Sequence, residues 1–267
     1  MTAPRGRGER VLVVAKAPAP GRTKTRLCPP LSPDEAATLG RAMLLDTLET
    51  CRAECDDVGI LYADPHEAEA LRDLAGPGAR LVLQDGHGLT DALRSGSVAA
   101  LADADAVALV SSDIPGVPAG SLRRAFAKLG DGADVVLGPG LDGGYWLVAL
   151  RAPHAAPFED IPWSTPDVLD VTRERCAAAG LAVALLPAWR DVDTVGDLAA
   201  LLADRDGLPG RRSAATLDRL VQAGRMSTPA VGRRRAAEAP ALAIATASPR
   251  DHRPHDPTQH AQEVHSR

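Results

Sequence analysis

Short apolar runs alternate with longer mixed segments along roughly the first two hundred residues of the chain. Runs such as "VLVV", "VALV" and "VVL" are almost continuously apolar, which is typical of strands buried on both faces of a sheet. The segments between them are predicted to be helices that cover those faces. Strands alternating with helices predict an α/β fold with a doubly wound, mostly parallel sheet, which resembles a Rossmann fold.

The elements follow from this pattern and from local start signals. The predicted strands are 11–15, 58–63, 80–84, 106–111, 134–137, 145–150 and 181–186. The predicted helices are 33–54, 65–74, 89–101, 119–129, 165–179 and 194–204. Ser32, Pro33 and Glu35 form a start signal for the longest helix, with a capping serine followed by an acid three residues later. Ligands of such sheets bind beyond the carboxyl ends of the strands, so we expect the chemistry in the loops there.

Four regions are predicted along the chain. Residues 1–9 form a flexible N-terminus, and residues 10–206 form a single domain. Residues 207–225 are a linker or one more helix, because "TLDRLVQAG" has a helical pattern. From residue 226 to 267 Ala, Arg, Pro, His and Gln dominate without a period, which predicts a disordered tail.

Charge and cysteine usage exclude several classes of protein. The net charge is −5, and ten Arg against five acidic residues from Gly207 onward leave −10 on residues 1–206. An acidic body argues against a nucleic-acid partner. No apolar run reaches about 18 residues, so no membrane span is expected. The four cysteines include no Cys-x-x-Cys pair, which favours a reducing cytoplasm as the location.

The loop after the first strand is strongly basic, in contrast to the acidic body. In "VLVVAKAPAPGRTKTRL" four cations follow the strand: Lys16, Arg22, Lys24 and Arg26. The loop does not match a P-loop, and Pro18 and Pro20 remove two backbone donors that a phosphate cradle would use. Side-chain charge must then hold an anion, at roughly 4 kcal/mol per contact before desolvation. The alternative is a solvated basic loop without a ligand.

Aspartates follow three other predicted strands. Asp113 in "VSSDIPGVP" is well placed to hold Mg²⁺ or Mn²⁺, which prefer oxygen ligands and bridge to phosphates, although a turn or capping aspartate is the alternative. Asp142 lies in "GPGLDGGYWLVAL", where a plain hairpin turn is the alternative. Asp191 and Asp193 in "WRDVDTVGDL" point to the same side if extended, which suits a shared cation, whereas capping of the next helix is the alternative.

Two further loops carry polar side chains that suit a ligand. Gln84 ends a predicted strand in "LQDGHGLTDAL", where its amide can read a nucleobase edge by paired hydrogen bonds. In "IPWSTPDVL" Ser164 and Asp167 have the spacing of a capping box, which predicts a helix start. Trp163 in the same stretch is a candidate to line an acceptor pocket.

These loops, taken in order, resemble the nucleotide-diphospho-sugar transferase superfamily, which has the glycosyltransferase-A fold. The stretches "KAPAPGRTKTRL", "GPGLDGGYWL", "IPWST" and "DVDTVGDL" are similar to a bacterial branch labelled as arsenosugar-biosynthesis-type glycosyltransferases. The resemblance covers about residues 10–205, so it implies that the domain at 10–206 is nucleotide-sugar transferase-like.

The resemblance also implies roles for the candidate residues. The donor would be a nucleotide-sugar or a nucleoside triphosphate, the cofactor a divalent cation (Mg²⁺ or Mn²⁺), and the acceptor a small molecule. The nucleotide-binding residues would be Lys16, Arg22, Lys24, Arg26, Gln84 and Ser112. The metal-binding residues would be Asp113, Asp193 and Asp191. Ser111 stands where many relatives carry the first acid of an Asp-x-Asp motif.

Three functions are compatible with these features. The leading expectation is a metal-dependent glycosyltransferase, with Asp142 as the catalytic residue that acts as general base or orients the acceptor. The alternative is a nucleotidyltransferase of the guanylyl or cytidylyl type that releases pyrophosphate, which the four loop cations favour. The third is a non-catalytic nucleotide-binding protein, which the missing acid at Ser111 suggests.

Overall fold

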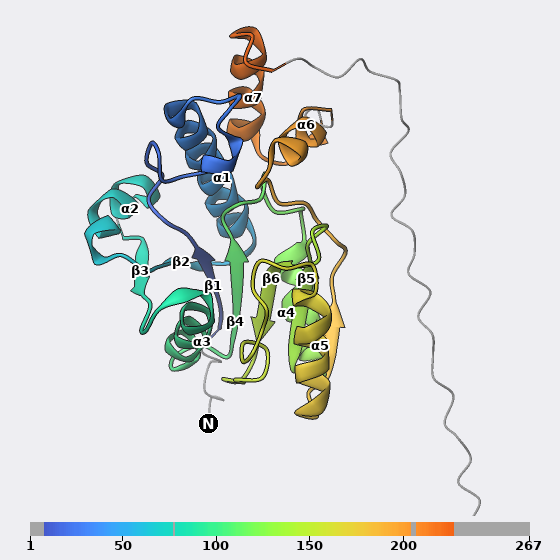
Figure 1. Ribbon diagram of the computed structural model, residues 1–267. Coiled ribbons are helices and arrows are strands. Elements are labelled where there is room, and N and C mark those ends of the chain that lie inside the picture. Colours follow the sequence, from blue (N-terminus) through green and yellow to red (C-terminus); the bar gives the residue numbers. More distant parts are fainter. Residues whose placement is uncertain (1–7, 77, 204–206, 227–267) are drawn as a thin grey trace, which may run out of the picture. The chain divides into compact units, whose positions relative to one another are not determined.

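Seven strands of the described residues form one sheet in the order β3-β2-β1-β4-β6-β5-β7 (Figure 1). The structure is a computed structural model that describes residues 8–76, 78–203 and 207–226. The strands are β1 (Glu9–Val14), β2 (Asp57–Tyr62), β3 (Arg80–Leu83), β4 (Ala106–Ser111), β5 (Val135–Pro139), β6 (Tyr145–Leu150) and β7 (Val183–Leu185). β6 runs antiparallel to its neighbours β4 and β5, and the other pairs are parallel. The predicted doubly wound, mostly parallel fold is therefore confirmed.

Helices alternate with strands along most of the chain, as the sequence pattern predicts, and two helices of the described residues follow the last strand. The helices are α1 (Pro33–Glu54), α2 (Ala68–Ala75), α3 (Gly88–Leu101), α4 (Ser121–Gly130), α5 (Val168–Ala178), α6 (Val195–Ala203) and α7 (Arg211–Gln222). Two short 3₁₀ helices, η1 (Thr25–Leu27) and η2 (Pro65–Glu67), precede α1 and α2. Among the described residues, no helix combines the length and apolarity needed to cross a bilayer.

Successive strand residues pack against different helices, because side chains alternate between the two faces of a sheet. Val13 of β1 packs in a cluster with Leu48 of α1 and Phe126 of α4. Its neighbour Leu12 belongs to a second cluster on the opposite face, with Cys176 of α5. Both faces are therefore covered, which explains the continuously apolar strands.

Local signals set the start of α1 as predicted. The Ser32 hydroxyl accepts a hydrogen bond from the Glu35 amide at 3.2 Å, and the Glu35 carboxylate accepts one from the Ser32 amide at 2.8 Å. This reciprocal pair satisfies two of the donors that an α-helix leaves free at its N-terminus. The pattern that identified the helix therefore identifies its first residue as well.

A third apolar cluster joins α7 to segments that follow β1 and β7. It contains Leu27 of η1, Val192 of the segment before α6, and Leu217 and Leu220 of α7. Each of these side chains is 5% exposed or less. The region at 207–225, expected to be a linker or a helix, therefore contributes a helix that packs on α1. The expected tail at 226–267 lies outside the described residues except for Met226.

The carboxylate of Asp46 on α1 holds the first turn of α7. It is 3% exposed. It accepts hydrogen bonds from the Ser213 amide and hydroxyl, both at 2.7 Å, and from the Arg212 amide at 3.1 Å. A negative charge at this position also interacts favourably with the helix dipole. One buried side chain therefore anchors the C-terminal helix to the body.

We predict that Asp46→Ala lowers the free energy of unfolding by roughly 2 kcal/mol or more, because several donors lose a charged acceptor in a buried place. Alanine is a good helix former, so the loss cannot come from α1 itself. Urea unfolding measures the effect. The control is Glu49→Ala, because Glu49 also pairs with Arg212 but is 62% exposed. Equal losses in the two variants would contradict the anchoring role of Asp46.

Candidate active site

A cavity of about 980 Å³ lies at the carboxyl edge of the sheet. The basic loop follows β1 and the Asp113 loop follows β4, and from these two neighbouring strands the chain continues in opposite directions along the sheet, to β2 and to β5. Such a switch point is where doubly wound sheets bind ligands. All ten residues expected to form the site line the cavity: Lys16, Arg22, Lys24, Arg26, Gln84, Ser112, Asp113, Asp142, Asp191 and Asp193. Their roles as ligands stay predictions.

Lys24 connects the basic loop to the acidic side of the cavity. Its Nζ lies 3.0 Å from Asp113 Oδ1 and 2.8 Å from Asp193 Oδ1. The lysine side chain is only 4% exposed, whereas the two carboxylates are about half-exposed. The Lys24 backbone has φ 51° and ψ 39°, a left-handed conformation that is uncommon for residues other than glycine and is often found at functional sites. Two distant loops thus converge on one ammonium group.

The four loop cations have different surroundings. Arg22 Nη2 lies 3.0 Å from Glu67 Oε1 and 3.7 Å from Asp64 Oδ2, so the η2 segment neutralises this guanidinium. Lys16 and Arg26 are exposed and have no hydrogen bond or ion pair with any residue that the structure describes. These two cations are therefore available to an anion in the cavity.

The segment before α6 presents its aspartates to the cavity because other residues cap the helix. The Thr194 hydroxyl accepts a hydrogen bond from the Asp197 amide at 3.2 Å, and the Asp197 carboxylate accepts one from the Thr194 amide at 2.7 Å. This capping box frees Asp193 to contact Lys24. Burial, with the nearby charges of Asp142 and Asp193, raises the pKa of Asp191 to about 6.

Asp113 and Asp193 fit a divalent cation that arrives with a polyphosphate. Both carboxylates already meet at one positive atom, the Nζ of Lys24. No group of three or more metal-ligating side chains is present among the described residues. Mg²⁺ is commonly bound by one or two carboxylates and completed by substrate phosphates. Two oxygen ligands of the right kind would thus come from the protein and the remaining ones from substrate and water, and this metal-binding role stays a prediction.

Local hydrogen bonds position the Ser111 hydroxyl and the Gln84 amide, which lie at the ends of two strands. The Ser111 hydroxyl accepts the amide of Asp113 at 3.1 Å, so the residue that replaces an acid stabilises the turn before Asp113. Gln84 lines the cavity, and its side-chain amide donates a hydrogen bond to the Gly86 carbonyl at 3.1 Å. Its expected contact with a base stays a prediction.

The Asp142 loop is both a hairpin connection and part of the cavity wall. β5 and β6 pair antiparallel on either side of it, and Asp142 Oδ1 accepts the Gly144 amide at 2.9 Å. Gly143 has φ 91°, and a Cβ atom there would lie 2.1 Å from the Pro166 carbonyl oxygen. Only glycine fits this close approach. The loop is therefore a hairpin turn, as one interpretation of the sequence predicted, and it also lines the cavity, as the other predicted.

The structure differs from the expected start of α5. The helix begins at Val168 and has no side-chain cap, so the expected capping box of Ser164 and Asp167 is absent. Ser164 instead has φ 66° and lines the cavity. Trp163 also lines it, and its indole Nε1 donates to the Thr90 hydroxyl at 2.7 Å. The tight turn through Ser164 takes the place of the first expected turn of helix.

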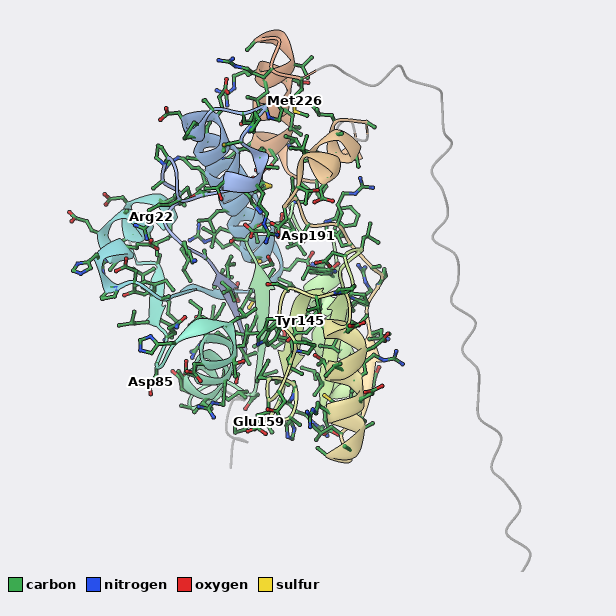
Figure 2. The ribbon with its side chains drawn as sticks, viewed as in Figure 1. Arg22, Asp85, Tyr145, Glu159, Asp191 and Met226 are labelled. Carbon is green, nitrogen blue, oxygen red and sulfur yellow. The ribbon has the colours of Figure 1, made fainter. Side chains whose placement is uncertain are left out.

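Aromatic side chains of β6 and of the loop before α5 form part of the apolar lining of the cavity. The rings of Tyr145 and Trp163 meet edge to face with centroids 6.0 Å apart. Burial raises the pKa of the Tyr145 hydroxyl above its usual range, so it stays protonated. Figure 2 shows Tyr145 near the middle of the molecule, below Asp191 in this view. The lining of the cavity therefore includes aromatic side chains as well as charged ones.

The chain is similar in sequence to guanylyltransferases of known activity. The chain is 31% identical to the 2-phospho-L-lactate guanylyltransferase of Natronomonas pharaonis over 69% of its own length and 81% of the relative's. It is 34% identical to the phosphoenolpyruvate guanylyltransferase of Sphaerobacter thermophilus, over 49% of this chain and 64% of that one. Residues 47–165 match a family described as uncharacterised proteins conserved in bacteria, DUF2064.

A solved structure is similar to this chain in both fold and sequence. A protein of Desulfovibrio desulfuricans G20, assigned to the nucleotide-diphospho-sugar transferases, is 32% identical and superposes with a TM-score of 0.75 over 81% of this chain and 96% of that chain. The fold, the cavity and these relatives define the class of protein, a nucleotide-binding α/β transferase. The chain belongs to the nucleotide-diphospho-sugar transferase superfamily, in the same family as the 2-phospho-L-lactate guanylyltransferases.

The leading expectation of sugar transfer is wrong. The relatives matched over about 70% of this chain are 2-phospho-L-lactate guanylyltransferases, which support the nucleotidyl-transfer alternative. The physical reason for the error is that both reactions need the same parts at this edge of the sheet. A polyphosphate donor requires cations and carboxylates in either case, whether the transferred group is a sugar or a nucleotide.

Proposed function

We propose that this protein is a nucleotidyltransferase of the guanylyl type, which joins GMP from GTP to a small phosphorylated acid and releases pyrophosphate. The observation that carries the proposal is that Lys16, Lys24 and Arg26 line the same cavity as Asp113 and Asp193, with Lys24 in contact with both aspartates. The names of the relatives supply the acceptor class, because 2-phospholactate and phosphoenolpyruvate are both phosphorylated carboxylic acids. We place the activity in the domain predicted at 10–206.

In this reaction a phosphate oxygen of the acceptor forms a bond to the α-phosphorus of GTP, and the bond from that phosphorus to the bridging oxygen breaks. The electron pair leaves with pyrophosphate. Lys16 and Arg26 would neutralise the charge that develops on this leaving group. A divalent cation held by Asp113 and Asp193 would neutralise further phosphate charge when bound. The cavity offers both sets of groups at one edge of the sheet.

The acceptor determines what is required of Asp142. A phosphate group has its second pKa near 6, so it is largely a dianion at neutral pH and needs no general base. We therefore propose that Asp142 helps to orient the acceptor, with its carboxylate held in place by the hydrogen bond that Oδ1 accepts from the Gly144 amide. Ser112 and Gln84 remain proposed nucleotide contacts. The narrower arsenosugar-type branch and the cytoplasmic location stay predictions.

The proposal is tested by thermal shift and by pyrophosphate release. GTP with Mg²⁺ at about 100 times its dissociation constant is expected to stabilise the protein by about 2.7 kcal/mol, which is roughly 5–10 °C in melting temperature. Turnover is then assayed with GTP or CTP and with 2-phospholactate, phosphoenolpyruvate or no acceptor. Acceptor-dependent pyrophosphate release supports the proposal. Stabilisation by GDP- or UDP-sugars alone, without pyrophosphate release from a triphosphate, would refute it.

A further inference from the structure

The basic loop after β1 is attached to the η2 segment by one buried carboxylate that sequence reasoning did not identify. Glu67 has a side chain only 7% exposed. Its Oε2 accepts a hydrogen bond from the Ala17 amide at 2.9 Å, and its Oε1 accepts one from Arg22 Nη2 at 3.0 Å. No local pattern could reveal these contacts, because Glu67 is 50 and 45 residues away from its two partners along the chain.

Some of the other backbone donors of the loop are used within the loop itself. The Ala19 amide donates to the Thr23 hydroxyl at 2.9 Å, and the Thr23 amide donates to the Ala19 carbonyl at 3.0 Å. Pro18 and Pro20 have no amide hydrogen. With the Ala17 amide held by Glu67, the first half of the loop keeps its backbone donors for its own fold.

The far side of the loop is fixed by packing against α1. A Cβ atom added at Gly40 would lie 2.5 Å from Thr23 Cγ2, so the methyl group of Thr23 occupies the space that a side chain would fill. The loop is therefore held at Ala17 and Arg22 by Glu67 and at Thr23 by α1. Lys16 and Lys24 are the residues immediately before and after this fixed segment.

Arg22 also lies apart from the acidic side of the cavity. Figure 2 shows Arg22 beside α2, clearly separated from Asp191. Its guanidinium already pairs with Glu67 and approaches Asp64. A cation that is neutralised in this way contributes little to the attraction of a polyanion, which contrasts with the unpaired Lys16 and Arg26.

We infer that Glu67 is a positioning residue, which uses Ala17 and Arg22 to hold the basic loop so that Lys16 and Lys24 face the nucleotide phosphates. Arg22 then serves as the partner of Glu67 rather than as a phosphate ligand. The kinetic consequence rests on the proposed nucleotidyl transfer, whereas the structural consequence concerns the nucleotide-free protein and can be measured without any ligand.

The structural consequence is tested by amide hydrogen exchange of the ¹⁵N-labelled full chain without nucleotide. In Glu67→Ala the Ala17 amide is expected to exchange at least about tenfold faster than in the wild type, because it loses a charged acceptor. In Glu67→Gln, which keeps an acceptor oxygen, the increase is expected to be smaller. The amides of Val11 to Val13 in β1 serve as internal reference, because global destabilisation would accelerate them too. An unchanged Ala17 rate in Glu67→Ala would overturn the inference.

The kinetic consequence is tested by a double-mutant cycle on GTP binding. Glu67→Ala is expected to weaken GTP binding about tenfold and Arg22→Met by less, and the double variant no more than Glu67→Ala, because Glu67→Ala already removes the contact to Arg22. Full additivity would instead make Arg22 a direct phosphate ligand and overturn its assigned role. Asp64→Asn is the matched control, since it removes one charge beside Arg22 but no contact to Ala17. If the wild type binds no GTP, the proposed function fails, and the exchange experiment still decides the role of Glu67.

Discussion

Asp113→Ala is expected to lower kcat/KM for pyrophosphate release at least about a hundredfold while the protein keeps its fold. Loss of outer-shell partners of a metal ligand already costs 10–100-fold, so the loss of a proposed ligand should cost no less. Stability is expected to fall by about 1 kcal/mol at most. The Asp113 side chain is 51% exposed, and solvent screens its contact with Lys24.

The measurement combines a pyrophosphate-release assay with a melting curve for the same preparation. Asp131→Ala is the matched control, because Asp131 is an exposed aspartate at the end of α4 that does not line the cavity. Activity close to that of the wild type in Asp113→Ala would show that the carboxylate after β4 is not needed for the reaction. A large drop in melting temperature would mean that the activity loss reports unfolding.

Lys24→Met is expected to have the second-largest effect, with opposite consequences for phosphate and cation binding. Without its ammonium group, GTP binding and turnover should fall, the latter by about a hundredfold, which is the scale for removing one preorganised positive contact. In the nucleotide-free protein the same change leaves Asp113 and Asp193 facing each other without a counter-charge. We expect a loss of roughly 1 kcal/mol in stability, because both carboxylates are about half-exposed and screened.

The cation response distinguishes this role from a general loss of stability. Mg²⁺ or Mn²⁺ must compete with Lys24 Nζ for the same two carboxylates, so millimolar metal alone should raise the melting temperature of Lys24→Met more than that of the wild type. Lys16→Met is the control, because Lys16 is exposed and contacts neither aspartate through a hydrogen bond or ion pair. It should weaken GTP binding without changing the response to metal. Identical metal responses in all three proteins would disprove the competition.

The relatives change the expected reaction, but they leave the location of the predicted site unchanged. The cations and carboxylates that predicted a phosphate seat opposite a metal-binding aspartate do meet in one cavity. What the residues could not tell is which bond of the donor breaks. The charge pattern of a nucleotide-sugar and that of a nucleoside triphosphate are similar, so the same side chains suit both, and only relatives of known activity separate the two.

The sequence by itself determined the local structure and the edge at which the site lies. Apolar strands, the capping box at Ser32 and the order of strands and helices depend on neighbours a few residues apart, so their pattern is visible in the chain. Loops that follow parallel strands must meet at one edge, which is why the predicted residues line one cavity. This part of the architecture needs only periodicity and chain direction.

The tertiary structure alone decided which charges pair and which stay free. Lys24 meets Asp193 across 169 residues and Arg22 meets Glu67 across 45, distances at which no sequence pattern operates. Likewise, α7 packs in one apolar cluster with Leu27 and Val192, which are far from it in the sequence. Coulomb and packing energies depend on separation in space, so the division of labour among four similar cations exists only once the chain is folded.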